Sequence, residues 1–315
     1  MYYTPYEEMY KKVLEKFENT NVKNPINHKL VKSAFNKKKE NAHKGTCGSL
    51  LICAGSPGLT GAGCLSAMGA ARCGCGLVTL ACSEDLNTIF EIKLTETMTM
   101  PLPSENGIIK PDAYDKISDK LKSCNAFLYG PGLSTNPAIK ELLYKLMINS
   151  NIPMVIDADG LNVMSDNKDI LKQTSAPVIL TPHIGEFARL TGYNKEYILN
   201  NTTYLAEEFA REYNVIMVLK SHRTVVTNGY ETYENILGSP AMAVGGSGDV
   251  LSGMIASFLA QGNTPFKSAR AGVYLHSLAA DMATLEYGEL SLLPTDTIRY
   301  ISYAAKITSD RQDDL

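Results

Sequence analysis

One carboxylate with a run of glycines directly before it is the feature of this chain best suited to chemistry. The carboxylate is Asp249, and it is preceded by Gly245, Gly246, Ser247 and Gly248. Glycines let successive backbone N–H groups converge on one point, and the start of a helix adds positive partial charge there. Such a site could act as an anion hole for a transferring phosphoryl group, with Asp249 as a base for an attacking hydroxyl.

The apolar pattern after Asp249 predicts the helix that such a site requires. Apolar residues recur along one helical stripe, made of Val250, Leu251, Met254, Ile255, Phe258 and Leu259. The alternative is a plain glycine turn in which Asp249 is an ordinary N-terminal helix cap. The local pattern alone leaves both interpretations open.

Short apolar runs that alternate with helical segments predict the rest of the fold. The expected strands are residues 49–54, 77–82, 126–129, 153–156, 178–180 and 215–219, and residues 224–229 predict a hairpin. Continuous apolar strands separated by helices indicate an α/β fold with a mostly parallel sheet and helices on both faces. Polar residues and glycines recur where these strands end, which is the edge where open α/β sheets bind ligands.

Residues 1–42 precede this pattern as an N-terminal extension. A helical stripe over residues 6–17 contains Tyr6, Met9, Tyr10, Val13, Leu14 and Phe17. The Asn- and Lys-rich stretch at 19–41 is expected to be a connector. We expect the helix to pack on the main body, residues 43–315, or on a neighbouring subunit.

Composition limits the partners and the compartment. The chain has 315 residues and a formal charge of −3, which argues against a nucleic-acid or anionic-membrane partner. Its seven cysteines contain no CxxC pair, which favours a reduced cytoplasmic location. The uncharged stretch between Lys44 and Arg72 is long enough to span a bilayer, but its many glycines and Pro57 predict a strand, a loop and a helix start.

Seven groups of residues follow one another in a characteristic order. They are HKGT, AGS and TGA within 43–62, GCGLVT at 74–79, GPGL at 130–133, DADGLN at 157–162, LTPHIGEF at 180–187, KSHRT at 220–224 and AVGGSGDVLSG at 243–253. This series resembles the NAD(P)H-hydrate dehydratases, a branch of the ribokinase-like superfamily, over about residues 43–285. The resemblance implies a ribokinase-like three-layer α/β/α sandwich.

The resemblance also implies a role for each matching position. Asp249 would be the catalytic carboxylate and would contact the substrate, together with Ala62, Gly132 and His183. The adenine nucleotide would be bound by Lys220, Ser221, His222, Arg223, Thr224 and Gly248.

The implied activity is that of a lyase, specifically a hydro-lyase, in metabolite repair. It would dehydrate the S-epimer of NADHX or NADPHX, the hydrated forms of NADH and NADPH, with ADP or ATP as co-substrate and Mg²⁺ as cofactor. The hydroxyl would be phosphorylated and then lost as phosphate, since hydroxide itself is a poor leaving group. The resemblance further implies a homotetramer, and the short extension implies that a separate protein epimerises the hydrate.

Three acidic side chains allow more than one interpretation. Glu186 lies where related kinases have a motif that helps hold Mg²⁺, so it could contact the ion indirectly or simply occupy the first turn of a helix. Asp157 and Asp159 follow a strand, where each could position the substrate or hold the loop by hydrogen bonds. We expect a structural role for at least one of these two aspartates.

Two departures from the family pattern bear on nucleotide preference, because Ser221 replaces a common Gly and Val244 replaces a usual Thr. Two rival functions also remain. A kinase of the same superfamily, acting on a vitamin-precursor alcohol, would use the same Asp249, but residues 43–46, 130–132 and His183 favour the dehydratase. A nucleotide-binding module without catalysis is the other rival, and the intact Asp249 argues against it.

Overall fold

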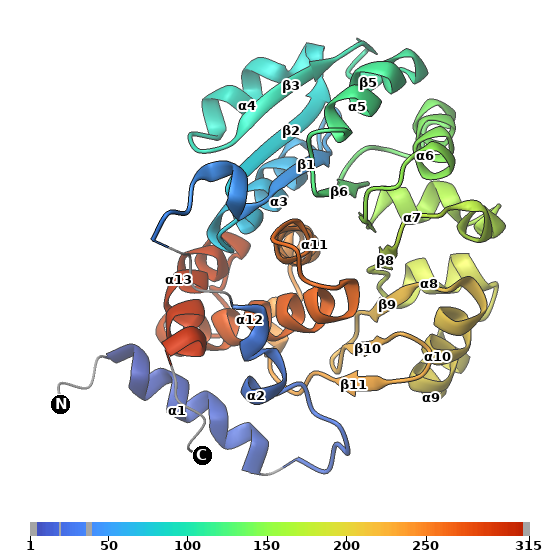
Figure 1. Cartoon of the computed structure of the whole chain (residues 1–315). Coiled ribbons are helices and arrows are strands. Elements are labelled where there is room, and N and C mark those ends of the chain that lie inside the picture. The colour runs from blue at the N-terminus through green and yellow to red at the C-terminus, as the bar shows by residue number, and fades with distance from the viewer. Residues whose placement is uncertain (1–4, 19, 36–39, 311–315) are drawn as a thin grey trace.

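The described residues of the computed structural model, 5–18, 20–35 and 40–310, form a three-layer α/β/α sandwich (Figure 1). Within these ranges a nine-stranded sheet has the order β11-β10-β9-β8-β7-β6-β1-β2-β3. Neighbouring strands are parallel except for the antiparallel pairs β9–β10 and β10–β11. The predicted mostly parallel sheet with helices on both faces is therefore confirmed.

The strand bounds agree closely with the predicted apolar runs. The sheet consists of β1 (Ser49–Cys53), β2 (Leu77–Ser83), β3 (Met98–Leu102), β6 (Ala126–Tyr129), β7 (Met154–Ile156), β8 (Val178–Leu180), β9 (Ile216–Leu219), β10 (Val225–Thr227) and β11 (Thr232–Glu234), and a separate hairpin pairs β4 (Ser104–Glu105) with β5 (Ile108–Ile109). The predicted hairpin is β10–β11, and its loop is four residues long. The sequence pattern missed β3, because this edge strand contains Pro101 and is only partly buried.

Helices cover both faces of the sheet. One face carries α3 (Thr60–Arg72), α4 (Asn87–Lys93), α11 (Ser247–Ala260), α12 (Pro265–Tyr287) and α13 (Pro294–Asp310), with α1 (Pro5–Glu18) and α2 (His28–Val31) outside them. The other face carries α5 (Tyr114–Leu121), α6 (Pro137–Asn149), α7 (Asp159–Met164), α8 (Ile184–Thr191), α9 (Lys195–Asn200) and α10 (Thr202–Tyr213). Short 3₁₀ turns span Lys32–Ala34, Lys44–Cys47, Glu84–Leu86, Pro111–Ala113, Lys168–Gln173 and Pro240–Met242.

Alternation along the strands divides the interior into two cores. On β1, Leu50 and Ile52 join the core under α11 and α12, while Leu51 and Cys53 join the core under α5 and α6. All four side chains are fully buried, which explains why the strand appears in the sequence as one continuous apolar run.

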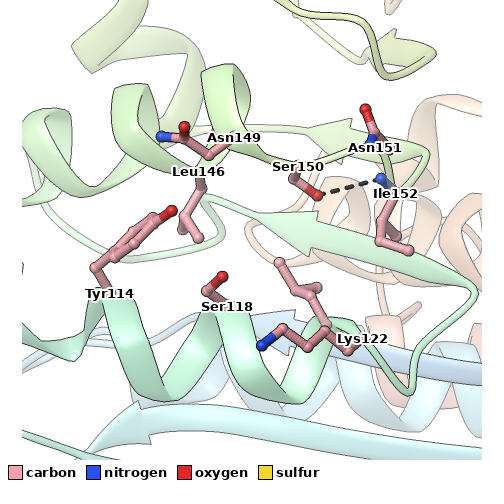
Figure 2. A pocket seen from close by; sticks show the side chains of 9 residues that line it. Tyr114, Ser118, Lys122, Leu146, Asn149, Ser150, Asn151 and Ile152 are labelled. Carbon is pink, nitrogen blue, oxygen red and sulfur yellow. Dashed lines mark hydrogen bonds between the residues drawn. The ribbon is translucent and has the colours of Figure 1, made fainter.

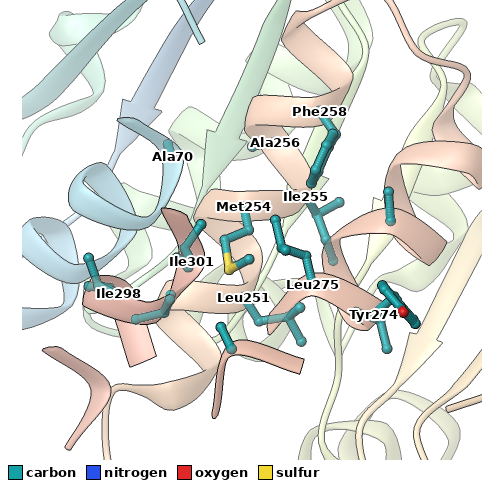
Figure 3. Close-up of a cluster of buried hydrophobic side chains, with 14 of the residues drawn as sticks. Ala70, Leu251, Met254, Ile255, Ala256, Phe258, Tyr274, Leu275, Ile298 and Ile301 are labelled. Carbon is teal, nitrogen blue, oxygen red and sulfur yellow. The ribbon is translucent and has the colours of Figure 1, made fainter. Parts of the chain in front are cut away.

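Helix α11 lies at the centre of the molecule and is seen end-on in Figure 1. It is buried on every side from Val250 to Ala260, so the predicted apolar stripe is only part of its buried surface. Its small residues permit close contact with α3, since a Cβ on Gly253 would lie 2.1 Å from the carbonyl oxygen of Ser66. Figure 3 shows the core that fixes the helix, with Met254 and Leu251 lying between side chains of α12 and α13.

The N-terminal extension is built into the main body. Helix α1 buries Tyr10 and Val13 against the core, and Lys16 Nζ lies 2.7 Å from a carboxylate oxygen of Asp281 on α12. Of the two packing partners considered for this helix, the main body is therefore the one observed.

The stretch expected to be a simple connector is more ordered than predicted in its described part. Around Pro25 the chain pairs with the open edge of β11, where Ile26 N donates to Glu234 O at 2.9 Å and Glu234 N donates to Asn24 O at 3.0 Å. Ile26 is fully buried, and α2 adds the buried Val31. The prediction missed this because the few apolar residues are separated by Asn and Lys.

The uncharged stretch between Lys44 and Arg72 divides into β1, a loop and α3, as predicted. None of the helices in the described ranges combines the length and apolar character needed to span a membrane.

Replacing Ile26 by alanine tests whether the extension is part of the folding unit. The side chain is fully buried, so its truncation is expected to lower the free energy of unfolding by about 2–5 kcal/mol. Thermal or urea unfolding measures the change, and Lys23→Ala at a neighbouring exposed position is the matched control. Equal stabilities of the two variants would contradict this account of the extension.

Candidate active site

The carboxyl ends of three neighbouring strands bring the predicted site residues together. Asp157 follows β7, His183 lies three residues after β8, and Lys220 follows β9. Lys220 N donates to Pro182 O at 2.8 Å, which places Lys220 and His183 side by side in a parallel bridge. This is the edge at which ligands bind in open α/β sheets.

A buried ion pair lies at the centre of this edge. Lys220 Nζ lies 2.8 Å from Asp157 Oδ1, and the two side chains are 18% and 1% exposed. The ammonium also lies against the start of α11, because a Cβ on Gly248 would be 3.2 Å from it. Burial alone would lower the pKa of Lys220, but the carboxylates of Asp157, Glu186 and Asp249 raise it overall.

Asp249 is half-buried in the first turn of α11. Partial burial, together with the negative charges of Asp157, Glu186 and Asp159, raises its pKa to about 7, while Lys220 opposes the change. Within the described part of the chain, no hydrogen bond to this carboxylate is found. Burial and the neighbouring carboxylates therefore outweigh Lys220 and the helix start, which favour the ionised form of Asp249.

Backbone N–H groups at the start of α11 form a potential anion hole. Among the described residues, the N–H groups of Gly245, Gly246, Gly248 and Asp249 have no backbone acceptor. Gly246 adopts φ +96°, a conformation that favours glycine, and Ser247 begins the helix directly after it. Orphan donors at a helix start are suited to binding a phosphate group.

His183 caps α8 and is held in a defined state. Its Nδ1 accepts hydrogen bonds from Gly185 N at 2.8 Å and Glu186 N at 3.4 Å, while Glu186 Oε2 accepts from His183 N at 2.7 Å. Desolvation and the charges of Lys220 and Arg189 lower the pKa of His183, so the ring is neutral at pH 7. With Nδ1 accepting, the hydrogen lies on Nε2, and the exposed ring can offer a donor to a ligand.

The residues around Glu186 do not fit a protein-bound Mg²⁺. One carboxylate oxygen bonds to His183 N, and the other lies 3.5 Å from His183 Nε2. Burial raises the pKa of Glu186 to about 7, and Asp157 is occupied by Lys220. No cluster of three or more metal-ligating side chains occurs in the described ranges. Glu186 is thus part of a capping box, and an indirect role near Mg²⁺ stays a prediction.

Ala62 and Gly132 meet at the neighbouring part of the same edge. A Cβ on Gly132 would lie 3.0 Å from the Cβ of Ala62 on α3. Asp159 holds this loop, since its Oδ2 accepts from Ser134 N at 2.8 Å and its Oδ1 accepts from Asn162 Nδ2 at 3.1 Å. Of the two aspartates in this segment, Asp159 therefore has the structural role that the sequence favoured.

The loop after β9 is closed by the serine that departs from the family pattern. Ser221 Oγ donates to Arg223 O at 2.7 Å and accepts from Arg223 N at 3.2 Å, while Thr224 Oγ1 donates to Ser221 O at 3.4 Å. His222 and Arg223 are exposed on this loop. The hydroxyl of Ser221 thus supplies a turn that glycine would leave flexible.

Two pockets lie at the opposite edge of the sheet. Figure 2 shows one of about 220 Å³ between Tyr114 and Ser118 of α5 and the end of α6, where Ser150 Oγ accepts from Ile152 N. A larger one of about 600 Å³ begins at Val178 and Ile216, the first residues of β8 and β9. Neither pocket is lined by a predicted site residue, so we place the candidate site by its chemistry rather than by concavity.

The ion pair between Asp157 and Lys220 was missed at the sequence level. Lys220 was expected only to bind the nucleotide, and Asp157 was left between two roles. A strand ending in Asp and a nearby strand ending in Lys are the one signal that could have suggested it, because both ends lie on the same edge.

The sheet order and the overall architecture define a ribokinase-like fold. A model of the NAD(P)H-hydrate dehydratase family matches residues 50–303. The chain belongs to this family.

Individual relatives agree with that assignment. The bifunctional NAD(P)H-hydrate repair enzyme Nnr of Moorella thermoacetica is 38% identical over 278 residues, covering 87% of this chain and 52% of the relative. The ADP-dependent (S)-NAD(P)H-hydrate dehydratase of Neisseria meningitidis is 35% identical, covering 79% of this chain and 81% of the relative. The chain thus spans about half the length of the bifunctional relatives that it matches.

A solved structure extends the similarity to three dimensions. The ADP/ATP-dependent NAD(P)H-hydrate dehydratase of Bacillus subtilis, co-crystallised with ATP and Mg²⁺, superposes with a TM-score of 0.79 at 28% identity. The match covers 92% of this chain and 99% of that structure.

Asp249→Asn is expected to stabilise the protein in a pH-dependent way. The folded pKa of about 7 exceeds the ordinary value of 3.8, so the ionised carboxylate destabilises the folded state increasingly as pH rises between these values. The gain in Tm from the substitution should therefore grow from pH 4 to pH 7 and level off above it. Thermal unfolding across pH measures this gain.

The matched control for that series is Asp166→Asn. Its hydrogen bond to Lys140 lowers the pKa of Asp166, so neutralising Asp166 brings no gain that grows with pH. A pH-independent effect of Asp249→Asn would contradict the electrostatic environment described for Asp249.

Proposed function

We propose that this chain catalyses the ADP- or ATP-dependent dehydration of the S-epimer of NADHX or NADPHX, with Asp249 as catalytic base. The observation that carries the proposal is that Asp249 lies in the first turn of α11, directly after Gly245, Gly246 and Gly248, whose N–H groups have no backbone acceptor among the described residues. A phosphate of the nucleotide can bind these donors while Asp249 meets the substrate hydroxyl. Family membership supports the same reaction.

The chemistry follows from the roles of these groups. Asp249 accepts the hydroxyl proton as the hydroxyl oxygen attacks the terminal phosphorus of the nucleotide, and the remaining nucleotide leaves. The anion hole and the Lys220 ammonium stabilise the negative charge on the transferring group. The electron pair of the ring nitrogen then expels the phosphate, and loss of a proton from the neighbouring ring carbon to water restores the dihydronicotinamide.

Substrate and nucleotide are assigned to neighbouring parts of the edge. Ala62, Gly132 and the Nε2–H donor of His183 would contact the hydrated nicotinamide, supported by the contact of Ala62 with Gly132. Lys220, Gly248 and the loop from Ser221 to Thr224 would bind the nucleotide. Any Mg²⁺ would then be held by the nucleotide phosphates and water, since Glu186 and Asp157 are engaged by other groups.

We further propose that residues 43–315 form the dehydratase domain and that the protein is a cytoplasmic homotetramer. A separate protein would epimerise the hydrate. A kinase acting on a small alcohol would use the same Asp249, so the substrate must be settled by assay.

The assay supplies hydrated NADH or NADPH with ADP or ATP and follows the return of dihydronicotinamide absorbance. Wild-type protein should restore it only when a nucleotide is present. Asp249→Asn should lower kcat by at least about 10²-fold while leaving nucleotide affinity nearly unchanged, because the base is lost and the backbone donors remain. Absence of repair with either nucleotide, or an active Asp249→Asn variant, would overturn the proposal.

The rate should also report the protonation of Asp249. A base must be ionised, and the pKa of Asp249 is raised to about 7, so kcat/KM for the hydrate should fall tenfold per pH unit below about pH 7 and level off above it. Asp249→Glu, which keeps a carboxylate, should retain an acid limb. A flat profile from pH 5 to pH 8 would show that this group does not act as the base.

A further inference from the structure

The proposed reaction assigns no role to the buried carboxylate of Asp157 at this site. Asp157 is 1% exposed, at the end of β7, and its only charged hydrogen-bond partner among the described residues is Lys220. A buried ionised pair loses water on both partners, so it is weak evidence for stability by itself. Its place next to the first turn of α11 therefore suggests a functional reason.

The backbone around the pair is held on both sides. Asp157 N donates to Tyr129 O at 3.1 Å, and Asp157 O accepts from Gly160 N at 2.9 Å. Lys220 N donates to Pro182 O at 2.8 Å in the bridge beside His183. The ion pair with Asp157 Oδ1 holds the ammonium between the end of β9 and the end of β7. The ammonium fits beside the start of α11 because residue 248 is glycine, and a Cβ there would lie 3.2 Å from Nζ.

The charged groups around the Lys220 ammonium lie on several different elements. The carboxylates of Asp157, Glu186 and Asp249 attract the ammonium from the loop after β7, from α8 and from α11. The nearby histidines, His183 after β8 and the buried His276 on α12, are both uncharged at neutral pH, because desolvation lowers the pKa of each. Lys220 thus supplies fixed positive charge where carboxylates converge.

We propose that Asp157 is a positioning residue that fixes the Lys220 ammonium beside the first turn of α11, where it serves as the permanent cation for a nucleotide phosphate in place of a protein-bound divalent ion. The inference deepens the proposed function and rests on it for the identity of the phosphate. Asp157 itself touches neither substrate nor nucleotide and acts through Lys220.

The geometry distinguishes this role from that of a metal site. Asp157 and Glu186 supply the carboxylates that a divalent ion would use, but Lys220 Nζ is within 2.8 Å of the first and His183 N is within 2.7 Å of an oxygen of the second. Across the described ranges no group of three metal-ligating side chains is present. Mg²⁺ titrated into the nucleotide-free protein should therefore show no saturable binding, and saturable binding would overturn the proposal.

A double-mutant cycle on nucleotide affinity tests the coupling between the two residues. The dissociation constants of ADP and ATP are measured by calorimetry for wild type, Asp157→Asn, Lys220→Met and the double variant. Asp157→Asn should weaken binding about tenfold or more, as expected for the loss of a positioned charged donor. The double variant should bind no more weakly than Lys220→Met, because Asp157 acts through Lys220. Additive losses would overturn the proposal.

Two further comparisons separate positioning from folding. Asp166→Asn removes an exposed carboxylate from another lysine pair, the one with Lys140, and should leave nucleotide affinity unchanged. Should Asp157→Asn prove insoluble, Lys220→Met and the double variant still decide, because equal affinities support the proposal and a weaker double variant contradicts it.

A pH profile gives a readout that a purely structural role would not move. Removing the negative charge of Asp157 should shift the acid limb of kcat/KM to lower pH, because Asp157, like Glu186 and Asp159, raises the pKa of Asp249 while Lys220 lowers it. An unmoved limb in Asp157→Asn would leave Asp157 with a structural role only. Absence of hydrate turnover in wild type would count against the proposed function alone, because the nucleotide-binding cycle does not depend on turnover.

Discussion

The close contact between α3 and α11 is the constraint on which the site depends. Gly253 on α11 lies against the backbone of Ser66, and Gly69 on α3 lies against Val250, so the two helices approach more closely than side chains would allow. α11 is thereby sunk into the core, and its first turn reaches the sheet edge where β7, β8 and β9 end. The packing of α11 from Val250 onward thus fixes the position of Asp249, while the Asp249 side chain itself stays partly exposed.

Charge then decides the state of the groups that this packing assembles. Burial, together with the negative charge of Asp157 nearby, raises the pKa of both Asp249 and Glu186 to about 7. Lys220 limits the repulsion without removing it. A base that titrates near the working pH is effective in proton transfer, whereas a fully stabilised carboxylate would be weaker, so the electrostatic strain of the cluster serves the proposed reaction.

The sequence revealed elements and neighbours more readily than pairings across space. Buried parallel strands and the start of α11 were predictable, because continuous apolar runs and a glycine-rich turn are local signals. β3 was not, since its partial burial and Pro101 weaken the pattern. The pairing of Asp157 with Lys220 spans 63 residues and depends on the order of strands in the sheet. The raised pKa of Asp249 could not be inferred either, because it arises first from burial in the folded chain and then from the charges of Asp157, Glu186 and Asp159.

The edge pairing of β11 with the segment around Pro25 has a consequence for how the molecule forms. Asn24 Nδ2 donates to Thr232 O across 208 residues of chain, so the two halves of this contact are made far apart in time during synthesis. Until they meet, β11 presents unpaired backbone groups that another chain could pair with. Contacts so distant in sequence close slowly, and this outer strand is therefore a place where a newly made molecule is open to self-association.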